Sequence, residues 1–104
     1  MENKSYQLRY LPLFKQDLIS TANYITNVLK NEDAALRLID DVETAILERL
    51  NNPVAFEPYR SAKKRDYPYY RIYVRNYVIY YVVIDDVMEV RRLMYGARDT
   101  DRHL

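Results

Sequence analysis

The sequence predicts an α+β fold in which an N-terminal strand and two helices precede a three-stranded antiparallel meander. Three observations support this order. Apolar residues recur at helical spacing through residues 12–51, residues 70–95 alternate or run continuously apolar, and two turn-forming pairs divide that second region. Because each helix has one apolar face, we expect a helix hairpin packed on one face of the sheet. We assign residues 1–104 to a single domain, which at this length can bury a core.

The first predicted elements are a short strand at residues 6–10 and a helix at residues 12–30. The strand alternates in polarity, and Pro12 suits the first helical turn, where its missing N–H costs nothing. The residues of the predicted buried helix face are Phe14, Leu18, Thr21, Ala22, Ile25, Val28 and Leu29. This spacing predicts that one side of the helix packs against the rest of the domain.

A second helix is predicted to follow Asn31 and to end at Asn51-Asn52-Pro53. Asn31 is a favourable N-cap residue, and the two acidic residues after it suit a helix N-terminus. The apolar stripe of this helix consists of Ala35, Leu38, Ile39, Val42, Ala45, Ile46 and Leu50. Because the link between the helices is short, they should form an antiparallel hairpin.

The second half of the chain predicts a surface loop at residues 53–68 and then three strands. These strands are Tyr70–Val74, Val78–Ile84 and Val87–Tyr95, separated by turns at Arg75-Asn76 and Asp85-Asp86. The middle strand is continuously apolar, so we expect it to be central and covered on both faces. Gly96, the only glycine, marks where the last strand leaves the sheet.

Several of the 12 tyrosines fall in these strands. We expect Tyr80 or Tyr81 in the core, because both belong to the central strand. Tyr70, Tyr73 and Tyr95 are predicted to serve a surface role, where a ring could stack on a base or line a sheet edge.

Composition narrows the class of protein. The chain has no cysteine and one histidine, so we predict no disulfide, no metal site and no cofactor. It also has no run of eighteen apolar residues and no apolar segment near its N-terminus. We therefore expect a cytoplasmic protein that does not enter a membrane.

Positive charge gathers between residues 59 and 75. The basic residues there are Arg60, Lys63, Lys64, Arg65, Arg71 and Arg75, against the single acidic residue Asp66. Such a cluster favours binding of a polyanion, and it also suits a solvated loop kept soluble by charge. Arg91 and Arg92 should point to opposite faces of their strand, so that one joins Arg71 and the other pairs with a helix residue such as Asp40 or Glu43.

The element order and several short motifs resemble the RelE/ParE superfamily of bacterial toxins. The motifs are Tyr10-Leu11-Pro12, Asn52-Pro53, Tyr70-Arg71-Ile72-Tyr73-Val74, the strand from Asn76 to Val83, and Tyr95-Gly96-Ala97-Arg98-Asp99. The resemblance covers nearly the whole chain. It implies the toxin of a type II toxin-antitoxin pair, which is held inactive by a cognate antitoxin protein.

The resemblance leaves two targets open. RelE-like members cut ribosome-bound mRNA, and by resemblance their catalytic positions would include Arg71 and Arg98, with His103 as an acid or base. Other basic positions of that set fall on Tyr73 and Val78, and a distal tyrosine falls near Leu104, so the set is incomplete. Lys63, Lys64 and Arg65 could supply basic groups from the loop, with Tyr73 and Tyr95 contacting the target.

ParE-like members inhibit DNA gyrase without catalysis, and the long hairpin of residues 12–51 leans slightly toward them. Whether the chain is an enzyme therefore depends on its target. A third hypothesis is a decayed, non-toxic binding module that retains only the antitoxin interface. For that interface we predict Phe14 and Leu18, although the same stripe also fits the core.

Overall fold

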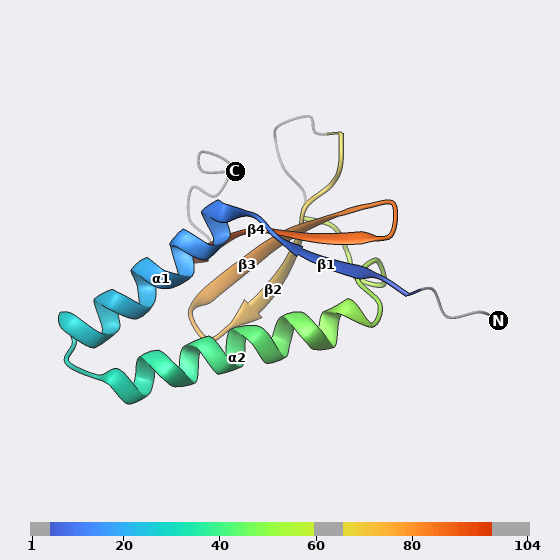
Figure 1. Ribbon diagram of the computed structural model, residues 1–104. Helices are drawn as coiled ribbons and strands as arrows, with labels where there is room; N and C mark the ends of the chain where they lie inside the picture. The colour runs from blue at the N-terminus through green and yellow to red at the C-terminus, as the bar shows by residue number, and fades with distance from the viewer. Residues whose placement is uncertain (1–4, 60–65, 97–104) are drawn as a thin grey trace.

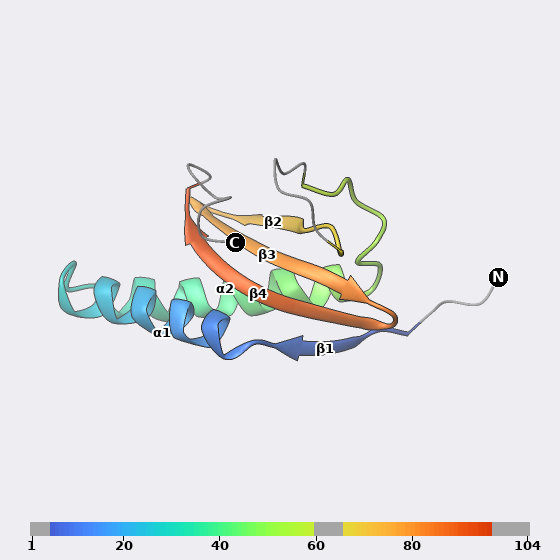
Figure 2. The same cartoon turned by 90° about the horizontal axis from the view of Figure 1, so that it is seen from above.

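Four strands form one sheet, and two helices cover one of its faces, as Figure 1 and Figure 2 show from two directions. The computed structural model describes residues 5–59 and 66–96. Its elements are β1 (Gln7–Tyr10), α1 (Pro12–Asn27), α2 (Glu32–Leu50), β2 (Tyr70–Val74), β3 (Tyr77–Ile84) and β4 (Val87–Tyr95). This order confirms the α+β fold, the helix hairpin and the three-stranded meander predicted from the sequence.

The two helices begin where predicted, but α1 ends three residues before the predicted position at residue 30. Lys30 has a φ of 56°, and the Asn31 N–H donates to the carbonyl of Ile25. A residue in the left-handed conformation, followed by a backbone hydrogen bond back to the last helical turn, ends the helix here. The Asn31 side chain then accepts from the Ala34 N–H at 3.0 Å and caps α2, as predicted.

The sheet has the strand order β1-β4-β3-β2, so β4 and β3 are both central. β1 runs parallel to β4, whereas β2, β3 and β4 pair antiparallel through tight turns. Arg75 and Asp85 adopt positive φ in those turns, and Gly96 does so (φ 72°) directly after β4. The register shifts between Tyr80 and Tyr81, which leaves Arg91 as an extra residue of β4.

The sheet separates two apolar clusters. The larger lies between the sheet and the helices, and the smaller lies on the opposite face, where Tyr69, Val78, Tyr80 and Val82 are buried. Tyr80 and Tyr81 are both fully buried, so the core prediction for this pair is confirmed. The prediction for Tyr70 is wrong: its ring stacks on Tyr81 at 5.2 Å between the sheet and α2, because every second residue of β2 faces the helices.

Asp17 of α1 accepts hydrogen bonds from the part of β4 that extends past the end of β1. Its carboxylate accepts from the Leu93 backbone N–H at 3.0 Å and from the Arg92 Nε at 2.8 Å. The sequence predicted that either Arg91 or Arg92 would bond a carboxylate of the second helix. Arg92 does bond a helix carboxylate, but this carboxylate belongs to α1. α1 follows directly from β1 and therefore lies beside β4, whereas Asp40 and Glu43 belong to α2.

The end of α2 is bonded to the sheet through Arg49. Its Nη1 donates to the carbonyl of Arg71 at 3.1 Å and to the Tyr81 hydroxyl at 2.9 Å. The Tyr81 hydroxyl donates in turn to the carbonyl of Pro53 at 2.7 Å. These bonds hold β2, and with it Arg71, against the start of the loop that follows α2.

Candidate functional site

The face of the sheet opposite the helices presents arginines interleaved with tyrosines. We call it the open face, defined by Arg9, Tyr59, Tyr69, Arg71, Tyr73, Glu89 and Arg91. Strand alternation places these side chains away from the helices, because their neighbours Leu8, Tyr10, Ile72, Val74, Met88 and Val90 pack on the helix side. The loop reaches this face where the Tyr59 N–H donates to the Tyr69 carbonyl at 2.6 Å.

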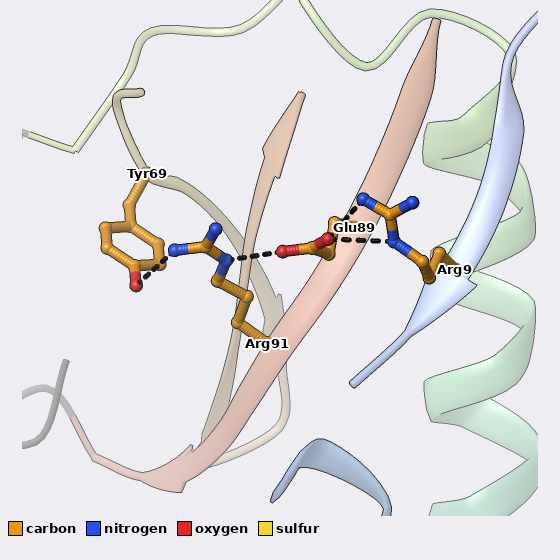
Figure 3. A network of polar contacts seen from close by, with 4 residues as sticks. All are labelled: Arg9, Tyr69, Glu89 and Arg91. Carbon is orange, nitrogen blue, oxygen red and sulfur yellow. Dashed lines mark hydrogen bonds and ion pairs between the residues drawn. The ribbon is translucent and has the colours of Figure 1, made fainter. Parts of the chain in front are cut away.

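A buried carboxylate lies at the centre of the open face. Glu89 accepts from the Nε of Arg9 at 2.8 Å on one oxygen and from the Nε of Arg91 at 2.8 Å on the other. Arg91 also donates through Nη1 to the Tyr69 hydroxyl at 3.2 Å. Figure 3 shows Glu89 between the two guanidinium groups, with Tyr69 beyond Arg91. The network joins β1, β4 and the residue preceding β2.

The electrostatics of this network keep Glu89 ionised. Burial by itself raises the pKa of the Glu89 carboxyl. The hydrogen bonds and positive charges of Arg9 and Arg91 lower this pKa by more than burial raises it, so the pKa lies below the ordinary value. The pKa of Arg91 is raised, because bonds to Tyr69 and Glu89 outweigh the effect of its burial. Both groups therefore remain charged at neutral pH.

Arg71 occupies a different environment on the same face. Its guanidinium carbon lies 4.6 Å from the ring centre of Tyr59 and 5.6 Å from that of Tyr73. None of the carboxylates in residues 5–59 and 66–96 forms an ion pair with it. A guanidinium that stacks on aromatic rings and has no ion-pair partner among the described residues can bind an acidic group of a partner.

Tyr73 and Tyr95, both predicted to contact a target, lie at the same end of the sheet. They are 62% and 74% exposed, and together with Arg75, Tyr77 and Gly96 they line a hollow of about 320 Å³. A larger hollow of about 580 Å³ adjoins it, lined by Ser20, Thr21, Tyr24, Leu29, Tyr77 and Tyr95. Exposed aromatic rings around a concave surface are typical of protein interfaces.

A third hollow, of about 170 Å³, runs between the two helices and contains both residues predicted for the antitoxin interface. It is lined by Tyr10, Phe14, Lys15, Leu18, Val42, Glu43 and Ile46. Phe14 is only 2% exposed and stacks on Tyr10 at 5.3 Å, so it belongs to the core and forms the floor of the groove. Leu18 is half-buried and therefore offers a partner more surface than Phe14 does.

Other predicted site residues fall outside the described parts of the chain. These are Lys63, Lys64, Arg65, Arg98 and His103. The structure brings Arg71 and Tyr73 together, and Tyr73 with Tyr95, but it separates all three from the groove between the helices.

Sequence reasoning did not identify Arg9, Tyr59, Tyr69 or Glu89. One signal was available, because Glu89 is a charged residue between the apolar Met88 and Val90 of a central strand. No group of histidine, cysteine or acidic residues suited to a metal ion occurs within residues 5–59 and 66–96. Over the same residues, neither helix has the length and apolar character needed to cross a bilayer.

Comparison with known families places this fold among small toxins of toxin-antitoxin systems. The family described as "ParE toxin of type II toxin-antitoxin system, parDE" matches residues 8–100, and this chain belongs to it. It is thus a toxin of a type II toxin-antitoxin system, and the resemblance to the RelE/ParE superfamily is confirmed. A search of curated proteins found no match.

Solved structures share the fold at low sequence identity. The chain is similar to the chromosomal ParDE system from P. aeruginosa, with a TM-score of 0.69, 13% identity, and coverage of 90% of this chain and 99% of that one. For the E. coli DinJ-YafQ toxin-antitoxin complex the TM-score is 0.55 at 12% identity, covering 88% and 92%. YafQ from E. coli strain BL21(DE3) matches with 0.55 at 15%, covering 91% and 96%.

Proposed function

We propose that this toxin arrests growth by binding DNA gyrase, and that a cognate antitoxin neutralises it by occupying the groove between the helices. The observation that carries the proposal is the chemistry of the open face. Two of its arginines are bonded to Glu89, which is held ionised, and the third is stacked between tyrosines. Such groups favour binding of a partner over transfer of a proton.

Cleavage of RNA makes different demands. It needs a base for the 2′-hydroxyl, an acid for the leaving oxygen and stabilisation of the phosphate charge, with acid and base titrating near the working pH. Glu89 has a pKa below its ordinary range, which makes it a poor acid at neutral pH. Val78, which by resemblance replaces a basic group of RelE-like enzymes, is buried at 2% exposure in the smaller apolar cluster.

The proposed contact with gyrase is the surface around Tyr73 and Tyr95. Tyrosine is enriched among residues that contribute most to protein interfaces, and loss of one such residue typically costs about 2 kcal/mol, or roughly 30-fold in affinity. The two rings line one hollow, so a single element of the partner can contact both.

A supercoiling assay tests the target. Purified toxin added to gyrase, ATP and relaxed plasmid should block supercoiling, and Tyr73→Ala with Tyr95→Ala should abolish the block at the same concentration. Tyr67→Ala is the matched control, because this tyrosine is also exposed but lines neither hollow that contains Tyr95. Full supercoiling in the presence of wild-type toxin would refute the proposal.

A second candidate is ribosome-dependent mRNA cleavage, favoured by the lack of an ion pair between Arg71 and any carboxylate of residues 5–59 and 66–96, since such an arginine could contact a phosphate. Cell-free translation with primer extension measures it: cuts that need ribosomes and disappear in Arg71→Ala would establish this candidate. If gyrase and message are both unaffected and cells grow normally when the toxin is expressed alone, the chain is a non-toxic binding module.

The antitoxin contact is tested separately. The toxin should form a complex with the product of the adjacent open reading frame, and Leu18→Arg should weaken that complex at least about 30-fold by placing a charge in an apolar groove. Ile19→Arg is the matched control, since Ile19 is 60% exposed on the same helix and does not line the groove. Equal effects of the two substitutions would exclude the groove as the interface.

A further inference from the structure

Two guanidinium groups of the open face converge on one internal anion. Arg9 directs its Nε and Nη2 at one oxygen of Glu89, and Arg91 directs its Nε at the other. The arginine side chains are 50% and 30% exposed, whereas the Glu89 side chain is 7% exposed. The cations are therefore within reach of solvent, while the carboxylate between them is largely screened from it (Figure 3).

The N–H groups that Arg9 directs at Glu89 are the same groups that arginine uses to bind a phosphate. Paired N–H groups of a guanidinium form the fork with which arginine binds carboxylate or phosphate oxygens. Arg9 directs both N–H groups of this edge at the same oxygen of Glu89, so this edge is closed to an external anion while the carboxylate stays in place. The low pKa of Glu89 means that the internal anion persists at neutral pH.

We infer that Glu89 determines specificity by acting as an internal counter-ion that prevents Arg9 and Arg91 from binding the phosphates of single-stranded nucleic acid. Removing its charge creates a phosphodiester-binding site on the open face. The inference deepens the proposed function and rests on it. A toxin whose target is a protein is more selective if this face does not bind RNA. Arg71, which lacks a described carboxylate partner, would lie on the same face as the two released arginines.

The expected gain follows from counter-ion release. For single strands, the logarithm of the affinity falls with the logarithm of salt by about 0.7 per phosphate neutralised. Two released arginines should therefore steepen this slope by about 1.4. At about 50 mM salt the affinity of Glu89→Gln for RNA should exceed that of wild type by at least about tenfold.

The test is fluorescence anisotropy with a labelled single-stranded RNA, measured at several salt concentrations. Glu89→Gln preserves shape and removes the charge. Asp41→Asn is the matched control, since it changes net charge equally but frees only Arg75, an exposed residue paired with α2. Adding Arg9→Gln to Glu89→Gln should reduce the gain in slope by about half, to about 0.7, because only Arg91 then remains released. A folded Glu89→Gln protein that binds RNA no better than Asp41→Asn overturns the inference.

A second measurement uses the wild-type protein and does not depend on the stability of a variant. In a ¹H–¹⁵N spectrum of the arginine Nε–H groups, inorganic phosphate should shift the signal of Arg71 and leave those of Arg9 and Arg91 in place. Phosphate-dependent shifts of Arg9 and Arg91 would overturn the inference. Gyrase supercoiling measured on the same preparations reports on the proposed target independently, because anion binding is read without gyrase.

Discussion

Replacement of Asp17 by alanine should destabilise the fold far more than replacement of Asp41, although each residue forms an ion pair between a helix and the β2–β4 meander. Asp17 bonds Arg92 and the backbone N–H of Leu93, and its side chain is 15% exposed. Asp41 bonds only Arg75, across a pair in which both side chains are nearly half exposed. The expected difference in stability therefore comes from solvent exposure and from the bond to the backbone, and not from the length of the ion pair.

The magnitude follows from the groups left without a partner. Asp17→Ala leaves the Leu93 N–H at a sheet edge without its acceptor, at a cost of about 1 to 2 kcal/mol, and leaves the partly buried Arg92 without this carboxylate, at a similar cost. The expected loss is about 3 kcal/mol. Exposed ion pairs contribute below about 1 kcal/mol, so Asp41→Ala should lose less than that. Both aspartates lie inside helices, so the gain in helix propensity from alanine is the same for each.

Urea unfolding followed by circular dichroism measures both free energies of unfolding at neutral pH. Hydrogen exchange adds a local measurement, because the amide of Leu93 should lose protection in Asp17→Ala and keep it in Asp41→Ala. Equal losses of stability in the two variants, or a loss below about 0.5 kcal/mol in Asp17→Ala, would show that burial and the bond to Leu93 do not make Asp17 the more important residue.

Three further predictions concern stability. The pKa of Glu89 in the folded protein lies below its ordinary value of 4.5, so the ionised carboxylate stabilises the fold above pH 4.5. This stabilisation is lost as the pH falls through the folded pKa. Wild type should therefore lose more unfolding free energy than Glu89→Gln between about pH 7 and about pH 3. Tyr81→Phe should cost about 1 to 2 kcal/mol in urea unfolding by leaving the Pro53 carbonyl without its donor, whereas Tyr73→Phe should be near neutral. Gly96→Ala should raise the unfolding rate and cost about 1 kcal/mol through its φ of 72° alone, since no atom lies within 4 Å of the added Cβ.

Local patterns were sufficient for most elements of this fold. The N-cap at Asn31, the start of α1 at Pro12, the three strands of the meander and the exit at Gly96 each depend on residues close in sequence. Helical and strand periodicity also identified most of the buried residues of each element. The prediction was wrong for Val28 and Leu29, which are 61% and 57% exposed because α1 ends at Asn27 and does not extend its buried face that far. The end of α1 was placed too late because Lys30 adopts a left-handed conformation, which its residue type does not favour.

The candidate functional residues also differ in how far local sequence could place them. Of the three tyrosines predicted to lie on the surface, Tyr73 and Tyr95 are exposed and Tyr70 is buried. The partner of Arg92 depends on which helix lies beside β4, and this could not be derived from spacing.

Residue types and local periodicity were enough to identify the family, the element order and the arginines among tyrosines on the last strands. The parallel pairing of β1 with β4, which places Arg9 opposite Glu89, became visible in the folded domain alone. That pairing joins residues 80 positions apart and converts three separate charges into one network. No hairpin turn joins β1 to β4, so their register depends on how both strands pack in the assembled sheet.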